Sequence, residues 1–137
     1  MLPRLYRYSR ELLNHGDRML TMANSVFSCC PEGERALITL KCAGVHWWYK
    51  TASHAAELTS GYYNTNGRDA YADIAKLCKR HGALLNFTCT EMRDCEQPEE
   101  AFASPERLLK QVREPSLSIY KRSYFNVLGT LLPLMAK

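Results

Sequence analysis

Two short apolar segments, each followed at once by polar and aromatic side chains, constrain the fold of this chain most strongly. The first apolar segment, residues 36–40, leads into residues 41–50, which hold two tryptophans, a tyrosine, a histidine and two lysines. Residues 83–94 repeat this design, with apolar residues first and polar residues after them. Helical patterns lie between the two segments, and a helical crossover is the usual link between neighbouring parallel strands. The sequence therefore predicts an α/β fold in which two parallel strands each end in functional groups.

Apolar residues recur at helical spacing on both sides of the first strand. Residues 8–27 carry them at i, i+3 or i+4, and i+7, which predicts an amphipathic helix. One helix is predicted after Ser53, and a second between Asp69 as its N-terminal cap and Gly82 as its C′ residue. The Gly- and Asn-rich residues 61–67 separate these two helices. The buried face of the second helix is predicted to comprise Tyr71, Ile74, Ala75 and Cys78.

The first strand and the last helix carry further signals. The nearly continuous apolar run at residues 35–43 predicts a strand buried on both faces, after a polar turn at residues 31–34. Ser104 and Pro105 predict the start of a helix, with the serine as its cap. Glu114-Pro115 predicts the end of that helix. Its buried side is predicted to comprise Leu108, Leu109 and Val112.

Composition and charge exclude several classes of function. The net charge of +4 comes from scattered basic residues without a basic stripe, so we expect no nucleic-acid partner. The sequence has no run of 18 apolar residues, so we expect no membrane partner and no membrane-spanning helix. The first residues lack the apolar core of a secretory signal. An intracellular location, in the cytoplasm or a plastid, is the expectation that follows.

The cysteines and histidines show no pattern of a disulfide framework or of a metal site. Cys29 and Cys30 are adjacent, and Cys89 with Cys95 is not a C-x-x-C pair. The four histidines lack any recognised ligand spacing. No phosphate-binding loop is present either. We therefore expect no metal and no cofactor.

Residues 41–50 combine flat aromatic faces with hydrogen-bonding groups, and this combination suits a sugar ring. A sugar ring presents apolar C–H patches together with many hydroxyls. Adjacent tryptophans do not easily stack on the same sugar, so at least one of Trp47 and Trp48 is expected to support the loop instead. Tyr49 and Lys50 are expected to be supporting residues as well.

Several long motifs, in one collinear order, resemble the plant-type β-amylase family. These are AGVHWWYK, HAAELTSGYYN and LNFTCTEMRDCEQP, and the upstream YSRELLNHGDRML is similar to the helix before the sixth strand of that family. The resemblance implies an exo-acting α-1,4-glucan hydrolase on a (β/α)8 barrel. Such a TIM barrel takes about 250 residues. The 137-residue chain is therefore expected to be an incomplete barrel fragment, with two parallel strands and three or more helices.

The resemblance also implies a division of the chain and a set of site residues. Residues 1–113 are expected to form a partial β-amylase-like barrel segment, and residues 114–137 a divergent tail without family resemblance. By resemblance Lys41 and His46 contact bound glucan, and Thr88 lies in an inner loop where its hydroxyl helps to orient the reacting groups. Trp47 is expected to be a supporting residue. Glu91 matches a conspicuous glutamate of the family and is expected to order the loop through hydrogen bonds rather than to act as acid or base. The expected partner is an α-1,4-glucan or maltose.

No residue is assigned as catalytic. Inverting glycoside hydrolysis needs two carboxyl groups roughly 6.5–9.5 Å apart, one as acid and one as base. In β-amylases the resemblance places them in a GELRYP-type and a GENALPRYD-type segment, and this sequence contains neither. The family releases maltose from the non-reducing ends of starch-like polysaccharides, whereas this chain alone is expected to show little or no hydrolysis.

Two alternatives stay open from the sequence. The chain could act as a non-catalytic glucan-binding or regulatory protein that keeps the sugar-contacting surface. It could also be an unrelated small α/β scaffold with a tail that supplies an interaction surface. For the incomplete barrel, strands that lack neighbours are expected to make the chain unstable or prone to association unless a partner covers them.

Overall fold

The computed structural model describes residues 2–27 and 37–120 of the chain. The predicted polar turn at residues 31–34, the first residues of the predicted strand and the end of the tail from residue 121 lie outside the described residues. Along the described residues the elements are α1 (Leu2–Phe27), β1 (Thr39–Cys42), α2 (Ala55–Thr59), α3 (Tyr71–Arg80), β2 (Leu84–Phe87), the 3-10 turns η1 (Asp94–Glu96) and η2 (Glu99–Ala101), and α4 (Pro105–Tyr120).

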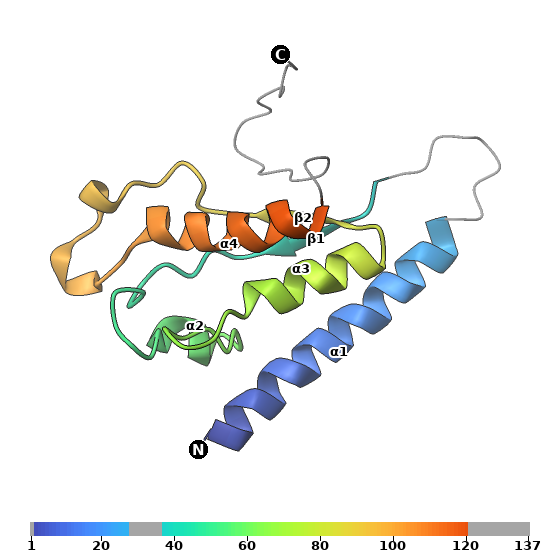
Figure 1. The fold of residues 1–137 in the computed structure, drawn as a ribbon, viewed down its shortest axis with the longest axis horizontal. Helices are drawn as coiled ribbons and strands as arrows, with labels where there is room; N and C mark the ends of the chain where they lie inside the picture. The colour runs from blue at the N-terminus through green and yellow to red at the C-terminus, as the bar shows by residue number, and fades with distance from the viewer. Residues whose placement is uncertain (1, 28–36, 121–137) are drawn as a thin grey trace, which may run out of the picture.

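The two strands are parallel, as predicted. In their register Lys41 lies opposite Asn86, and Cys42 lies opposite Phe87. Helix α3 is central to the packing, because it contacts α1, α4 and β2 (Figure 1). The fold prediction is confirmed at this level: the described part is a mixed helix and strand arrangement with two parallel strands.

The prediction that the first strand is buried on both faces is wrong. Successive residues of a strand point to opposite faces, and in β1 Cys42 is buried whereas Thr39 and Lys41 are exposed. The described helices cover the face that carries Cys42. The apolar run therefore predicted the strand correctly. It did not predict that only one face of the strand is covered by other elements.

Local sequence signals explain why α3 begins and ends where it does. The Asp69 carboxylate accepts hydrogen bonds from the N–H groups of Tyr71 and Ala72, at 2.9 and 3.3 Å, and so caps the first turn. At the other end Gly82 has a φ of +62°, and the N–H of Ala83 donates to the carbonyl of Cys78 at 2.9 Å. This is the Schellman arrangement that glycine favours. The predicted buried face of α3 is confirmed.

Helix α4 begins at Pro105, as predicted, but its cap and its end differ from prediction. Ser104 does not cap it with its hydroxyl, which donates instead to Asp94 Oδ2 at 2.7 Å. The other oxygen of Asp94 accepts from the N–H of Glu106 at 3.1 Å, so an aspartate from before the intervening loop caps this helix. The predicted end at Glu114-Pro115 is also wrong, since α4 continues to Tyr120. A proline inside a helix removes one hydrogen bond and bends the helix without always ending it.

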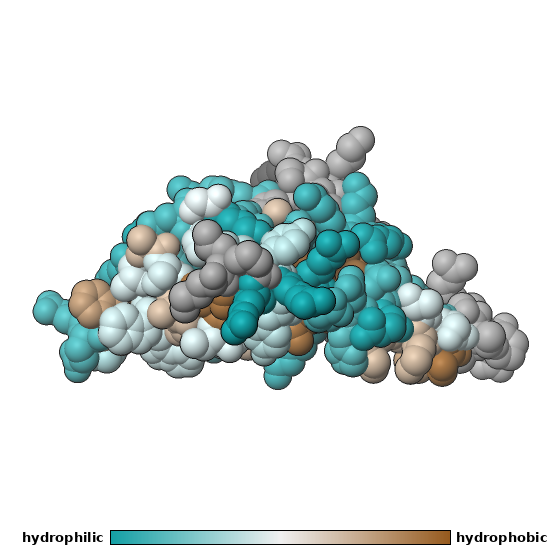
Figure 2. Space-filling view, turned by 90° about the horizontal axis from the view of Figure 1, so that it is seen from below, coloured by the Kyte–Doolittle hydropathy of each residue, from teal (hydrophilic) through white to brown (hydrophobic). Residues whose placement is uncertain are grey.

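The core lies between the strands and α3, α4 and α1. Its largest fully buried apolar side chains are Tyr71, Phe87, Leu85 and Leu108. Helix α1 begins earlier than its predicted start at residue 8, and large apolar side chains near its C-terminal end are exposed, among them Met22 at 58% and Val26 at 64%. On the face in Figure 2, hydrophobic residues reach the surface in separate areas between hydrophilic ones. Among the described residues no helix has the length and apolar character needed to cross a membrane.

Candidate functional site

The carboxyl ends of β1 and β2 lie side by side, and a close backbone contact joins the segments that follow them. The N–H of Gly44 donates to Thr88 Oγ1 at 2.9 Å, and the N–H of Thr88 donates to the Cys42 carbonyl at 3.2 Å. A Cβ at residue 44 would lie 2.2 Å from Cys89 Sγ and 2.8 Å from the Thr88 carbonyl oxygen. Only glycine fits this approach, so Gly44 fixes the position of the predicted ligand Thr88.

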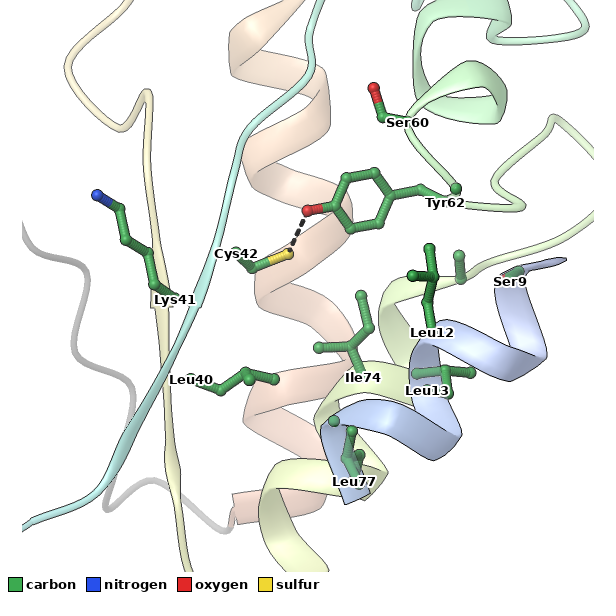
Figure 3. Close-up of a pocket in the computed structure, with 13 residues that line it drawn as sticks. Ser9, Leu12, Leu13, Leu40, Lys41, Cys42, Ser60, Tyr62, Ile74 and Leu77 are labelled. Carbon is green, nitrogen blue, oxygen red and sulfur yellow. Dashed lines mark hydrogen bonds between the residues drawn. The ribbon is translucent and has the colours of Figure 1, made fainter. Parts of the chain in front are cut away.

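Lys41 lies at the same edge but on the uncovered face of β1. Its side chain is exposed, while Cys42 is buried. In Figure 3 the Lys41 ammonium points away from Cys42 and from the apolar side chains beyond it. The structure thus leaves the Lys41 ammonium accessible on the face opposite the packed helices, where it can donate hydrogen bonds to a ligand.

His46 is buried and already engaged. It is 2% exposed, its Nδ1 lies 3.3 Å from the Gly44 carbonyl oxygen, and its Nε2 lies 3.2 Å from Gln97 Oε1. Its ring stacks on Trp47 with centroids 4.5 Å apart. A glucan hydroxyl can therefore reach Nε2 only where Gln97 gives way. Sequence reasoning missed Gln97, which lies within the LNFTCTEMRDCEQP motif but carried no signal of its own.

The two predicted supporting residues occupy exposed positions. Trp47 is 48% exposed and lies against His46, so it covers one face of the predicted ligand. Glu91 is exposed, and its Oε2 accepts a hydrogen bond from the Thr90 hydroxyl at 3.0 Å. These contacts show what surrounds Trp47 and Glu91. The supporting roles of both residues stay predictions.

A buried polar cluster behind this edge escaped sequence reasoning altogether. Glu57 is fully buried, and its carboxylate bonds to His54 Nδ1 at 2.8 Å, to the Tyr71 hydroxyl at 2.6 Å and to the Asn64 amide at 3.0 and 3.2 Å. The amides of Asn64 and Gln111 bond to each other at 3.0 Å in both directions. The i, i+3 spacing of His54 and Glu57 could have indicated a contact between them. It could not have indicated burial, because histidine–glutamate pairs on the surface of a helix have the same spacing.

This cluster anchors the segment that follows β1. The Tyr49 hydroxyl donates to Gln111 Oε1 at 2.8 Å, and the Tyr49 ring lies 4.4 Å from that of His54. Burial, followed by the charge of Glu57, raises the pKa of Tyr49 to about 12 and that of Tyr71 well above its ordinary value. Both phenols therefore stay protonated as donors. The cluster ties this segment to α2, α3 and α4 and so holds Tyr49 in a fixed position. The supporting role expected for Tyr49 stays a prediction.

Two thiols near the strand ends are not ionised, and the described residues form no metal centre. Burial raises the pKa of the Cys42 and Cys89 thiols to about 11, so both are neutral near pH 7. Cys42 Sγ instead donates to the Tyr62 hydroxyl at 3.4 Å. Within residues 2–27 and 37–120, no group of three or more His, Cys, Asp or Glu side chains could hold a metal ion.

A mostly apolar cavity of about 180 Å³ lies on the helix side of β1, between α1, β1 and α3. Leu12, Leu13 and Ile74 are among its walls (Figure 3). Lys41 also lines this cavity, although its ammonium points away from the apolar walls in Figure 3.

Comparisons with known proteins bear directly on this arrangement. Residues 4–121 match the family model described as Glycosyl hydrolase family 14. The chain is 53% identical over 105 residues to Beta-amylase of Glycine max, and 58% identical over 105 residues to Beta-amylase 1, chloroplastic, of Oryza sativa subsp. japonica. It is 55% identical over 108 residues to Beta-amylase 2, chloroplastic, of Arabidopsis thaliana.

Each of these three comparisons covers 77% of this chain, but only 20%, 19% and 19% of the respective relative. The chain thus spans about a fifth of the length of the curated relatives it matches. The resemblance stated from the motifs is confirmed, both in the family model and in relatives that share more than half of the aligned residues. The chain belongs to glycosyl hydrolase family 14.

Proposed function

We propose that this chain supplies the glucan-binding edge of a β-amylase, an enzyme that releases maltose from the non-reducing ends of α-1,4-glucans. The observation that carries the proposal is the meeting of the β1 and β2 carboxyl ends through the Gly44–Thr88 hydrogen bond. We further propose that β1 and β2 are the sixth and seventh strands of a (β/α)8 barrel. In that architecture the carboxyl ends of the strands carry the active site.

Three side chains divide the binding task. Lys41 donates from the uncovered face of β1 to sugar hydroxyls. The Thr88 hydroxyl, which accepts from Gly44, keeps its own proton to donate to a sugar oxygen. His46 contributes once Gln97 is displaced, with Trp47 covering its ring. Glu91 orders the loop after Thr88.

Acidic side chains close to this edge serve structural contacts, which supports binding without hydrolysis by this chain alone. Glu57 is buried within its cluster, Asp94 caps α4, and Glu96 Oε2 accepts from the N–H of Arg93 at 3.2 Å. We also propose that residues 1–113 form the barrel segment and residues 114–137 a tail, although α4 crosses that boundary.

Titration of the purified chain with maltotriose, followed by calorimetry, tests the proposal. We expect saturable binding that Lys41→Ala and Thr88→Ala each weaken about tenfold or more, equivalent to about 1.4 kcal/mol. Lys50→Ala is the matched control, because Lys50 is exposed and shares the segment but lies outside the strand edge. Equal loss in all three variants, or no binding by the parent chain, would refute the assignment.

Reducing-sugar release in the same samples separates binding from catalysis. We expect none above the background of buffer. Release of maltose by the chain alone would overturn the proposal of binding without hydrolysis and direct attention to Glu91, Asp94 and Glu96.

A plastid location is proposed from the relatives. Two of the three similar proteins described above, those of rice and Arabidopsis, are named chloroplastic. Immunodetection of the native protein in isolated plastids and in cytosol tests this, and recovery in the cytosol alone would contradict it.

A further inference from the structure

Trp48 and Phe102 form a half-exposed pair of aromatic rings beside the proposed site. They belong to different segments, one after β1 and one before α4, and their ring centroids lie 5.3 Å apart with planes inclined by 28°. Trp48 is 45% exposed and Phe102 is 46% exposed. Each ring therefore contacts its partner and still presents aromatic surface to solvent.

Both residues have an unusual backbone. Trp48 has a φ of 58° and Phe102 a φ of 45°, in the left-handed region that bulky side chains rarely adopt. Two hydrogen bonds of 2.9 Å lock the segments together, from the Trp48 N–H to the Ala101 carbonyl and from the Lys50 N–H to the Phe102 carbonyl. Core burial does not explain this conformation, because both rings are half exposed. Strain of this kind persists where surrounding structure over-determines it, and such places concentrate at ligand sites.

The pair is continuous with the proposed glucan edge. His46 precedes Trp48 by two residues and contacts Gln97, so the two segments that carry the aromatic rings also meet at a predicted ligand. Tyr49, which follows Trp48, is anchored to α4 through Gln111. The aromatic pair is thus held at a fixed place relative to His46 rather than on an independent loop.

The chemistry of this surface favours a sugar. A flat, partly exposed ring matches the apolar C–H face of a pyranose. Exposed Glu99 and Glu100 lie shortly before Phe102 along the chain and offer hydrogen-bonding groups for ring hydroxyls. Two rings alone are far smaller than the roughly 1,000 Å² that a specific protein interface buries.

We propose that Trp48 and Phe102 form an accessory platform on which one further glucosyl unit of a longer α-glucan stacks, beyond the unit held by Lys41, His46 and Thr88. The proposal rests on the proposed function, because it extends that binding edge outward. Trp48 and Phe102 then determine how strongly the chain prefers longer glucans, and they do not contact a short sugar.

The test compares maltose with maltoheptaose as ligands of the full 137-residue chain. The parent chain binds maltoheptaose more tightly than maltose. Trp48→Ala lowers the affinity for maltoheptaose about tenfold, while the Kd for maltose stays within about twofold of the parent value. Trp48→Phe keeps a flat ring and retains most of the preference, which separates stacking from a merely structural role. Phe102→Leu keeps apolar volume without a flat ring and loses part of the preference.

Met92→Ala is the matched control, since Met92 is another half-exposed apolar side chain near the site and is 39% exposed. It leaves the affinity for both sugars unchanged. Two results would overturn the platform and leave the proposed function standing. One is a parent chain that binds maltose but shows no preference for maltoheptaose, and the other is a Trp48→Ala variant that keeps the full preference. A parent chain that binds neither sugar overturns both.

Discussion

At the scale of single residues, the environment decides what a glutamate or a cysteine does. Glu57 and Glu91 lie in two of the motifs that resemble β-amylases, yet Glu57 is fully buried among three polar partners and Glu91 is exposed. Cys42 and Cys89 are packing residues at the strand ends, whereas Cys95 is exposed. Residue type alone could not separate these cases, because burial comes from segments far apart in sequence.

Replacing Glu57 with alanine removes the acceptor shared by Tyr71, His54 and Asn64. Each buried donor left without an acceptor costs about 1–3 kcal/mol, so we expect Glu57→Ala to lower the free energy of unfolding by about 3 kcal/mol or more. Urea denaturation measures it. Exposed Glu91→Ala is the matched control and is expected to change that free energy by less than about 0.5 kcal/mol. Equal effects of the two substitutions would show that the buried cluster contributes nothing.

Gly44→Ala places a methyl group against Cys89 Sγ and the Thr88 carbonyl. We expect it to lower the free energy of unfolding by about 1–3 kcal/mol and to weaken glucan binding, because Thr88 is displaced. Gly67→Ala is its control, since a Cβ there meets no atom within 4 Å. Unaltered stability and binding in Gly44→Ala would contradict the close approach of the two strand ends.

The raised thiol and phenol pKa values predict a loss of stability at alkaline pH. Burial raises the pKa of the Cys42 and Cys89 thiols from 9.0 to about 11. It raises the pKa of the Tyr49 hydroxyl from 10.0 to about 12. The unfolded chain therefore releases these protons at lower pH than the folded chain. Their contribution to stability is complete below about pH 9 and declines between about pH 9 and pH 12.

Urea denaturation at several pH values measures this decline. The double variant Cys42→Ala with Cys89→Ala is expected to flatten the first part of this decline. A decline of equal steepness in the double variant would mean that these thiols are not the groups responsible.

At the scale of elements, the sequence predicts those parts whose signals are local. Helix α3 follows from Asp69, its apolar face and Gly82, all within 14 residues. The cap of α4 could not be predicted in this way, because Asp94 reaches Ser104 and Glu106 across an intervening loop. The same division holds for the proposed binding edge. The motifs indicate Lys41 and Thr88, but the contact of His46 with Gln97 joins residues 51 positions apart and could not be predicted before the loop was seen folded.

The packing of α1 on the loop before α3 gives a prediction at this scale. Gly61 has a φ of +91°, and a Cβ there would lie 2.2 Å from Leu12 Cδ1 of α1. Gly61→Ala is thus expected both to strain the backbone and to push α1 away, which increases amide hydrogen exchange along α1. Gly82→Ala, with a φ of +62° and no atom within 4 Å of the added Cβ, carries the strain without the clash. Faster exchange of α1 in Gly82→Ala than in Gly61→Ala would contradict this packing.

At the scale of the whole molecule, the described sheet has two strands, so each strand has one edge without a described partner strand. Exposed strand edges and the exposed apolar side chains of α1, such as Met22 and Val26, favour association. We expect the purified chain to elute from a size-exclusion column in species larger than a 15.7 kDa monomer, increasingly so at higher concentration. A monomer at every concentration would show that these surfaces are covered.

The central claim is that the joined carboxyl ends of β1 and β2 bind α-glucan, and amide NMR of the ¹⁵N-labelled chain during titration with maltotriose tests it most directly. The account predicts that the largest chemical-shift changes fall on Gly44, His46 and Thr88, with little change at Gly16 and Leu77, which line the apolar cavity on the opposite side of β1. Shifts centred on that cavity, or no shifts at saturating sugar, would contradict it.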